Sequence, residues 1–272
     1  FENNGSSPST LEANRALDAY SLFPGIRLSG SDAVSAYCQS FLNQQAGIVT
    51  WLHLPRDRWP PEWANLGYDD PVVIMVLALY GHPDAGGYWE EHCEKQILAC
   101  NFVPVTGWRS TYWNADKQAL MVVYVDDFKL SGPSANLDKG WALIRQGIDT
   151  DKPHRMDLFL GCKHEESVQT SPWSGKQVRT LTYNMEPFLR DAVAKYQVLA
   201  GGVTLRRVTT PFLEDTEPEA TANTEAAAPG GKAPPNPTPT PAGELKHCCA
   251  SVLMKFLYAA RMCRYDLLHA IG

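Results

Sequence analysis

The stretch that decides the fold of this protein is Ala119-Leu120-Met121-Val122-Val123-Tyr124-Val125-Asp126-Asp127-Phe128-Lys129-Leu130. Its first part is a continuous apolar run, which is typical of a buried strand. The apolar pattern resumes directly after the two aspartates. The sequence therefore predicts a β-hairpin that carries Asp126 and Asp127 at its tip.

Two neighbouring carboxylates at such a tip need compensation. At a separation of about 4 Å they repel each other by roughly 4 kcal/mol at an effective dielectric near 20. Each raises the pKa of the other unless a cation lies between them. Mg²⁺, which takes one or two carboxylates together with substrate phosphates, is the expected partner. The alternative is an ordinary solvated turn.

A third carboxylate is expected at Asp32, because two-metal catalysis needs acids from more than one element. Asp32 follows a short extended segment, Ile26–Leu28, and precedes an expected helix over 33–43. The alternative role for this aspartate is to cap the N-terminus of that helix, which is common for Asp.

The remaining patterns predict an α+β fold with an antiparallel sheet. Turn residues and apolar spacing place strands at 48–54, 72–79, 111–113, 158–162 and 178–183, and helices at 13–23, 85–102, 137–147, 186–196 and 245–271. Residues 213–243 are rich in Pro, Ala and Glu and predict a linker without a core.

Composition leaves several function classes open. The chain has 272 residues, 44% of them hydrophobic, and a net charge of -6. Most of this charge lies in the expected linker, so a local basic groove remains possible elsewhere. The seven scattered cysteines fit a reducing intracellular setting. No apolar run reaches the roughly 18–20 residues of a membrane span. Both ends of the chain suggest a piece of a longer polyprotein.

Six segments, in order along the chain, resemble the reverse transcriptases of Ty/copia-type LTR retrotransposons. Asp32–Tyr37 is similar to motif A, and Tyr124–Asp127 to the Tyr-x-Asp-Asp box of motif C. The others are Ala78–Trp89 ("ALYGLKQAPRAW"), Phe159–Cys162 ("YFLG"), Thr210-Pro211, and Leu257–Arg261 with Arg264–Leu267 ("LLYLA…TRPDI"). The resemblance spans about 25–272, without the linker.

This resemblance implies a role for each matching residue. Asp32, Asp126 and Asp127 would bind two Mg²⁺ ions, with Mn²⁺ as a possible substitute. Tyr37 and Tyr124 would contact the substrate, with the Tyr37 ring under the sugar of the incoming nucleotide. The alternative for Tyr37 is a buried aromatic of a helix. Residues 159–161 (Phe159, Leu160 and Gly161) would hold the primer backbone, or would be plain core residues of a strand.

At the level of the whole chain, the resemblance implies an RNA-directed DNA polymerase with a right-hand fold. Residues 1–24 would be part of the fingers, 25–166 the palm, 167–212 a thumb-like region, and 244–272 the start of a connection to a ribonuclease H region. The partners would be an RNA or DNA template-primer, dNTPs, and the integrase and ribonuclease H parts of the same polyprotein. The location would be intracellular, in a cytoplasmic virus-like particle or the nucleus.

Some positions depart from the family pattern. Asp84 replaces the Gln of the "LKQAP" segment, Gly86 and Gly87 replace its Pro and Arg, and no basic fingers segment precedes Asp32. These departures favour an alternative, a catalytically decayed or domesticated fragment that only binds nucleic acid. A nucleotidyl cyclase or an RNA-templated RNA polymerase fits the motifs less well. The His and Cys residues within 247–269 match no usual zinc spacing.

Overall fold

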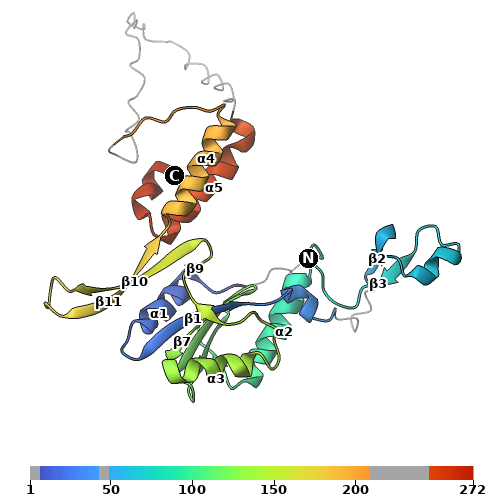
Figure 1. The fold of residues 1–272 in the computed structure, drawn as a ribbon, viewed down its shortest axis with the longest axis horizontal. Helices are drawn as coiled ribbons and strands as arrows, with labels where there is room; N and C mark the ends of the chain where they lie inside the picture. Colours follow the sequence, from blue (N-terminus) through green and yellow to red (C-terminus); the bar gives the residue numbers. More distant parts are fainter. Residues whose placement is uncertain (1–6, 43–48, 209–244, 272) are drawn as a thin grey trace, which may run out of the picture. The chain divides into compact units, whose positions relative to one another are not determined.

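The computed structural model describes residues 7–42, 49–208 and 245–271. The chain divides into two compact units: unit 1 is Phe1–Phe159 with Glu166–Leu181, and unit 2 is Leu160–Glu165 with Thr182–Gly272. The described part holds six α-helices and antiparallel sheets, so the predicted α+β class is confirmed (Figure 1). The expected linker at 213–243 lies outside the described residues.

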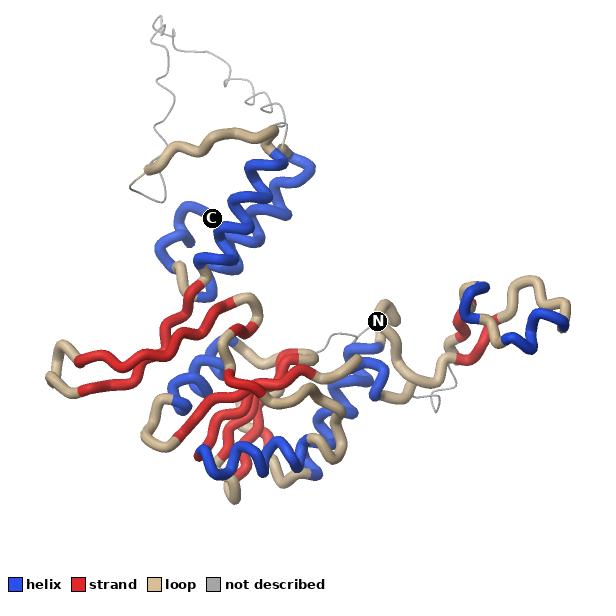
Figure 2. The backbone as a smooth tube through the Cα atoms, in the orientation of Figure 1, coloured by secondary structure: helices blue, strands red, loops and turns tan. Residues whose placement is uncertain are grey.

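The centre of unit 1 is a six-stranded sheet, and strands are drawn in red in Figure 2. The strand order is β4-β5-β6-β7-β1-β8. Every neighbouring pair in it is antiparallel. The strands are β4 (Val103–Pro104), β5 (Thr111–Asn114), β6 (Ala119–Tyr124), β7 (Asp127–Pro133), β1 (Ile26–Asp32) and β8 (His154–Arg155). The predicted hairpin is β6–β7, and β1 is inserted next to it although it lies far away in the sequence.

Helices cover both faces of this sheet. Met121 and Val123 of β6 and Phe128 of β7 point into a core with α2 (Ala85–Ala99) and α3 (Ser134–Ile144). Val122 and the other alternate residues point to the opposite face, where α1 (Leu11–Ser21) packs on β6 and β7. Because strand side chains alternate between faces, one hairpin supplies both layers. Each fully buried large apolar side chain stabilises the fold by about 1.5–3 kcal/mol.

Beneath α1 the sheet carries a buried ion pair. The Lys129 ammonium lies 2.7 Å from the Asp18 carboxylate, and the side chains are 1% and 4% exposed. Lys129 also lies over the Phe159 ring, 4.3 Å from its centroid. A buried charge pair of this kind is costly to break, because the remaining charge has no water to solvate it.

The predicted helix over 33–43 is wrong. Only a short 3-10 helix forms, η1 (Ala36–Gln39), after Ser35 adopts a left-handed φ of 49°. The backbone N–H groups of Ala33 and Val34 donate to strand-like partners, the carbonyls of Asp126 (2.8 Å) and Asp149 (3.0 Å). These contacts hold the backbone at Ala33 and Val34 against the neighbouring segments, and the left-handed Ser35 interrupts the φ values that a continuous α-helix needs.

A second, two-stranded sheet in unit 1 pairs β2 (Trp51–His53) with β3 (Val72–Ile74). Between them lie the 3-10 helices η3 (Arg56–Arg58) and η4 (Pro61–Asn65). The apolar run at 72–79 is therefore a strand only in its first three residues.

Three strands, β9 (Leu158–Phe159), β10 (Cys162–Thr170) and β11 (Gln177–Asn184), form a sheet in the order β11-β10-β9. The boundary between the two units crosses both β10 and β11. In unit 2, α4 (Glu186–Leu199) packs on α5 (Lys246–Met262), which is followed by η5 (Tyr265–Leu267) and α6 (Leu268–Ile271). Among the helices of the described residues, none has the length and hydropathy that crossing a bilayer requires.

Candidate functional site

Strand register brings the predicted aspartates together. Asp32, the last residue of β1, is directly opposite Asp127, the first residue of β7. Asp127 is also opposite Tyr124, the last residue of β6. Directly paired residues on antiparallel strands have Cβ atoms about 4.5–5.5 Å apart. The end of β1 and the tip of the β6–β7 hairpin thus form one acidic edge of the sheet, and Asp126 lies in the turn beside it.

The turn at Val125 and Asp126 is held in a strained conformation. Val125 has a φ of 61°, which a β-branched residue rarely adopts and which costs on the order of 1–3 kcal/mol. Two hydrogen bonds stabilise it: Trp89 Nε1 of α2 donates to the Val125 carbonyl (2.7 Å), and the Ala33 N–H donates to the Asp126 carbonyl (2.8 Å). Trp89 is 2% exposed, so its indole is a fixed support for the turn.

The loop that precedes β8 supports Asp32 from the other side. The Asp151 N–H donates to the Asp32 carbonyl (2.9 Å), and Ser31 Oγ donates to the Asp151 carbonyl (2.7 Å). Ala33 and Thr150 form an isolated antiparallel bridge. Asp32 therefore has its backbone in sheet contacts on both sides. The alternative capping role is wrong, because Asp32 ends a strand and Ser35 is the residue that precedes the 3-10 helix.

The electrostatics of the site centre on Asp127. Burial, followed by the charges of Asp32 and Asp126, raises the pKa of Asp127 from 3.8 to about 6, and a hydrogen bond with the Asp32 side chain contributes further. A freely solvated turn would not perturb a carboxyl group in this way. The charges of Asp32 and Asp126 both act on Asp127, so its carboxyl group keeps a proton to a higher pH than an ordinary aspartate does.

This cluster has the donor chemistry for a hard divalent cation. Carboxylate oxygens are the ligands that Mg²⁺ and Mn²⁺ take, and the mutual repulsion of these acids is what a cation would relieve. In the described ranges, no three His, Cys, Asp or Glu side chains are arranged to hold a metal ion. A side-chain hydrogen bond with Asp32 is among the causes that raise the pKa of Asp127. A bound cation would compensate the charges of both carboxylates.

Tyr37 of η1 lies against Tyr80, and the two ring centroids are 4.5 Å apart at an interplanar angle of 40°. Tyr37 also packs on the core cluster under the sheet. The pKa of Tyr80 is raised, first by burial and then by the charge of Asp126, which places Tyr80 near the acids. Sequence reasoning missed Tyr80 as a site residue, although it lies in the segment similar to "ALYG".

The predicted primer-grip residues form a turn at the start of the β9–β10 sheet. Leu160 and Gly161 have φ values of 49° and 75°, as two-residue hairpin loops require. Phe159 is buried against Lys129, and in unit 2 the Leu160 carbonyl accepts a hydrogen bond from Tyr258 Oη. The proposed contact of these three residues with the primer backbone stays a prediction.

Asp84 and the His and Cys residues within 247–269 are the remaining sequence features. Asp84 precedes the first turn of α2 and makes no side-chain capping bond. The side chain of His247 lies outside what the structure describes, and the cysteines of unit 2 belong to no metal-binding group among the described residues.

Comparisons with protein-family models, with curated proteins and with solved structures find no match to this chain. The site itself is therefore the basis for function. It offers Asp32 and Asp127 paired across two strands, Asp126 in the adjoining turn, and the Tyr37–Tyr80 ring contact nearby. The pKa of Asp127 is raised to about 6.

Proposed function

We propose that this chain is an RNA-directed DNA polymerase of the Ty/copia retrotransposon type, part of a polyprotein. The observation that carries the proposal is the pairing of Asp32 with Asp127 across β1 and β7, with Asp126 in the adjoining turn. Motifs A and C of the resemblance are about ninety residues apart in the sequence, and the register brings them to one edge. In this proposal the central sheet with its helices is the palm, and α4 belongs to the thumb.

Each site residue has a distinct role in the proposal. Asp32, Asp126 and Asp127 would hold two Mg²⁺ ions, with Mn²⁺ as a substitute. Such ions activate the 3′-hydroxyl of the primer and neutralise the charge of the triphosphate and its leaving group. Tyr37 and Tyr124 would contact the incoming dNTP, and residues 159–161 would position the primer backbone.

The chain contributes positioning and charge. The strained Val125 turn fixes the backbone that carries Asp126 and Asp127, so little reorganisation is needed when substrate arrives. The raised pKa of Asp127 reflects burial and a repulsion that bound cations would relieve. Tyr80, through its ring contact with Tyr37, would set the position of the residue under the sugar.

A second candidate is a catalytically decayed or domesticated fragment that binds nucleic acid without extending it. Two departures from the family pattern favour it. Asp84 stands where the family has Gln, and an acid there would repel a template or a triphosphate. No basic fingers segment precedes Asp32.

Primer extension decides between the two candidates. The full chain is incubated with poly(rA)/oligo(dT), dTTP and either Mg²⁺ or Mn²⁺. We expect metal-dependent extension that is lost in the double variant Asp126→Asn with Asp127→Asn. The matched control is Asp116→Asn, an exposed aspartate in the turn between β5 and β6.

The outcomes separate clearly. Extension that survives the double substitution would contradict the site assignment. If the wild-type chain binds the template-primer but incorporates no nucleotide with either metal, the decayed fragment is the correct alternative. The proposed partners and the intracellular location, in a virus-like particle or the nucleus, follow only if extension is observed.

A further inference from the structure

A pocket lies at the opposite end of β1 from the acidic edge. It has a volume of about 720 Å³ and belongs entirely to unit 1. Its walls are the first half of β1, the first turn of α3 and parts of β8, β10 and β11. Arg27 in this pocket and Asp32 at the acidic edge are five residues apart on one strand, which is roughly 17 Å. The two sites are therefore separate.

Three arginines converge on this pocket from three strands: Arg27 from β1, Arg155 from β8 and Arg179 from β11. Two acids, Glu166 and Asp138, line it with them, so the lining residues themselves have one more cation than acids. A third acid, Asp157, lies beside the pocket, 3.6 Å from Arg155. Arg27 is exposed and makes no ion pair within the described part of the chain. Its guanidinium is available to a ligand.

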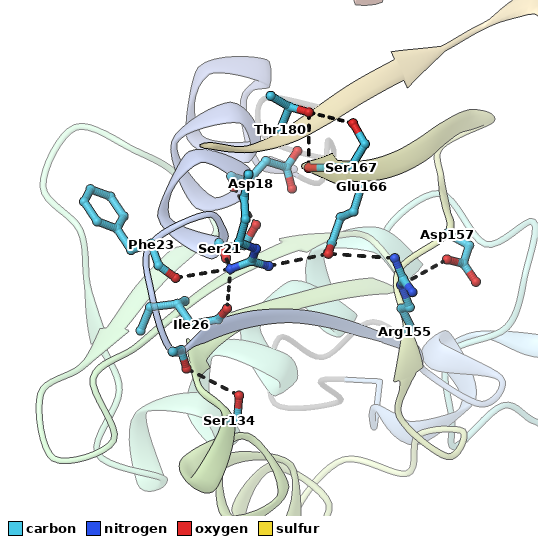
Figure 3. Close-up of polar contacts among 12 residues, drawn as sticks. Asp18, Ser21, Phe23, Ile26, Ser134, Arg155, Asp157, Glu166, Ser167 and Thr180 are labelled. Carbon is cyan, nitrogen blue, oxygen red and sulfur yellow. Dashed lines mark hydrogen bonds and ion pairs between the residues drawn. The ribbon is translucent and has the colours of Figure 1, made fainter. Parts of the chain in front are cut away.

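Glu166 lies between two of these guanidinium groups and is held loosely by both (Figure 3). One carboxylate oxygen is 3.5 Å from Arg179 and 3.8 Å from Arg155. Tight charge-assisted hydrogen bonds are about 2.7–2.9 Å long. The Glu166 carboxylate thus lies where a bound anion would contact both guanidinium groups, but its own contacts with them are long.

Arg179 is the fixed part of the pocket. Its Nη1 donates to the carbonyls of Ser21 (3.0 Å), Phe23 (3.2 Å) and Ile26 (3.1 Å), at the corner between α1 and β1 (Figure 3). This anchor keeps the guanidinium in place whether or not Glu166 is beside it. Arg155, by contrast, has a side chain that is 63% exposed, and its two ion-pair contacts, with Glu166 at 3.8 Å and Asp157 at 3.6 Å, are long. Exposed pairs of this kind are weak, so Arg155 can turn toward a ligand.

We propose that this pocket binds a small phosphoryl anion, such as diphosphate, with Arg27 and Arg155 as its mobile ligands and Glu166 as an internal competitor. Guanidinium groups bind phosphate oxygens in a bidentate manner, which favours phosphate over monovalent anions. Pockets of this size are typical of small-molecule sites. The proposal does not depend on the polymerase function, because none of the aspartates of the acidic edge takes part.

The experiment is calorimetric titration of the full chain with inorganic diphosphate, at low salt and with EDTA present. EDTA removes divalent cations, so the acidic edge cannot bind the probe through metal. We expect Glu166→Gln to tighten binding by about tenfold, because it removes a competing charge, and Arg27→Ala with Arg155→Ala to weaken it by about tenfold or more. All of these residues are at least partly exposed, and thermal melting would confirm that the variants fold.

Two controls locate the site. Arg58→Ala removes an exposed arginine of η3 that has its own partner, Asp57, and should leave diphosphate binding unchanged. The double variant Asp126→Asn with Asp127→Asn should also bind normally. The proposal is overturned if the wild-type chain binds no diphosphate, or if the Arg27 and Arg155 substitutions leave the affinity as it was. Binding of a single-stranded oligonucleotide without diphosphate binding would equally overturn it.

Discussion

Replacing Asp127 with asparagine should make the protein more stable at neutral pH in the absence of metal. Asparagine retains the size and part of the hydrogen bonding of aspartate but cannot carry a charge. At pH 7 the wild-type carboxyl must ionise next to Asp32 and Asp126, in a half-buried position. The substitution removes this repulsion. An acidic site that lowers stability is expected where carboxylates are arranged for a ligand rather than for folding.

The magnitude follows from the pKa of Asp127. The rise from 3.8 to about 6 corresponds to about 3 kcal/mol at roughly 1.36 kcal/mol per pKa unit, before any allowance for solvent. Solvent screening of a half-buried group reduces this to on the order of 1–2 kcal/mol. Between about pH 4 and pH 6 the folded protein holds a proton that the unfolded chain has released. Stability at this site therefore falls as the pH rises through that window.

The measurement is urea unfolding followed by tryptophan fluorescence, at pH 4 and pH 7, with EDTA present. All eight tryptophans lie in unit 1, so the signal reports on the unit that carries the site. Asp127→Asn should equal the wild type near pH 4 and exceed it by about 1–2 kcal/mol at pH 7. Asp116→Asn is the control and should show no such pH-dependent gain.

Adding Mg²⁺ to the same assay tests the role of the charge. A ligand present at ten times its dissociation constant stabilises the folded state by about 1.4 kcal/mol. We expect this gain in the wild-type chain at pH 7 and a smaller one in Asp127→Asn. A stability difference between the two proteins that stays the same from pH 4 to pH 7 would refute the electrostatic account of the cluster.

Three further substitutions probe the support around the site. Trp89→Phe removes the hydrogen bond to the Val125 carbonyl, so urea unfolding should show that the free energy of unfolding falls by about 1–3 kcal/mol. Primer extension should fall as well. Full activity would mean that the turn does not need this support. Tyr80→Ala should reduce discrimination between dNTPs and rNTPs by about two- to tenfold, since an aromatic pair contributes roughly 0.5–1.5 kcal/mol, whereas Tyr80→Phe should retain it because the ring still contacts Tyr37. Lys129→Met should destabilise the fold by about 3–5 kcal/mol by leaving the Asp18 charge buried and uncompensated, and adding Asp18→Leu should restore most of the loss. A mild effect of the single substitution would show that water reaches the pair.

The hairpin could be predicted from the sequence because its signals are local. An apolar run, a short polar turn and a second apolar run fix β6, β7 and the place of Asp126 and Asp127. The antiparallel sheet and five of the expected helical segments follow from similar local patterns, with ends that shift by a few residues. The position of Asp32 at the end of a strand was also visible in its flanking residues.

The contacts made by distant segments could not be predicted in this way. The segment after Asp32 has helical spacing, but its N–H groups are used by the carbonyls of Asp126 and Asp149. Tyr80 joins the site through a ring contact with Tyr37, and Trp89 through a backbone carbonyl. Arg179 supports a corner made by residues that are 153 to 158 positions away. None of these contacts leaves a signal in the local sequence of either partner.

The Arg179 anchor has a consequence for the order in which the protein forms during synthesis. Chains emerge from the ribosome at about 5–20 residues per second, and N-terminal segments meet first. The β6–β7 hairpin and β1 can form once residue 133 has left the ribosome. The three carbonyls at the α1–β1 corner gain their hydrogen bonds from Arg179 only after β11 has been synthesised. The corner of the sheet is therefore closed last, several seconds after its centre. A nascent chain stalled before Arg179 should expose this corner to proteolysis, and one stalled after the β10–β11 hairpin should protect it.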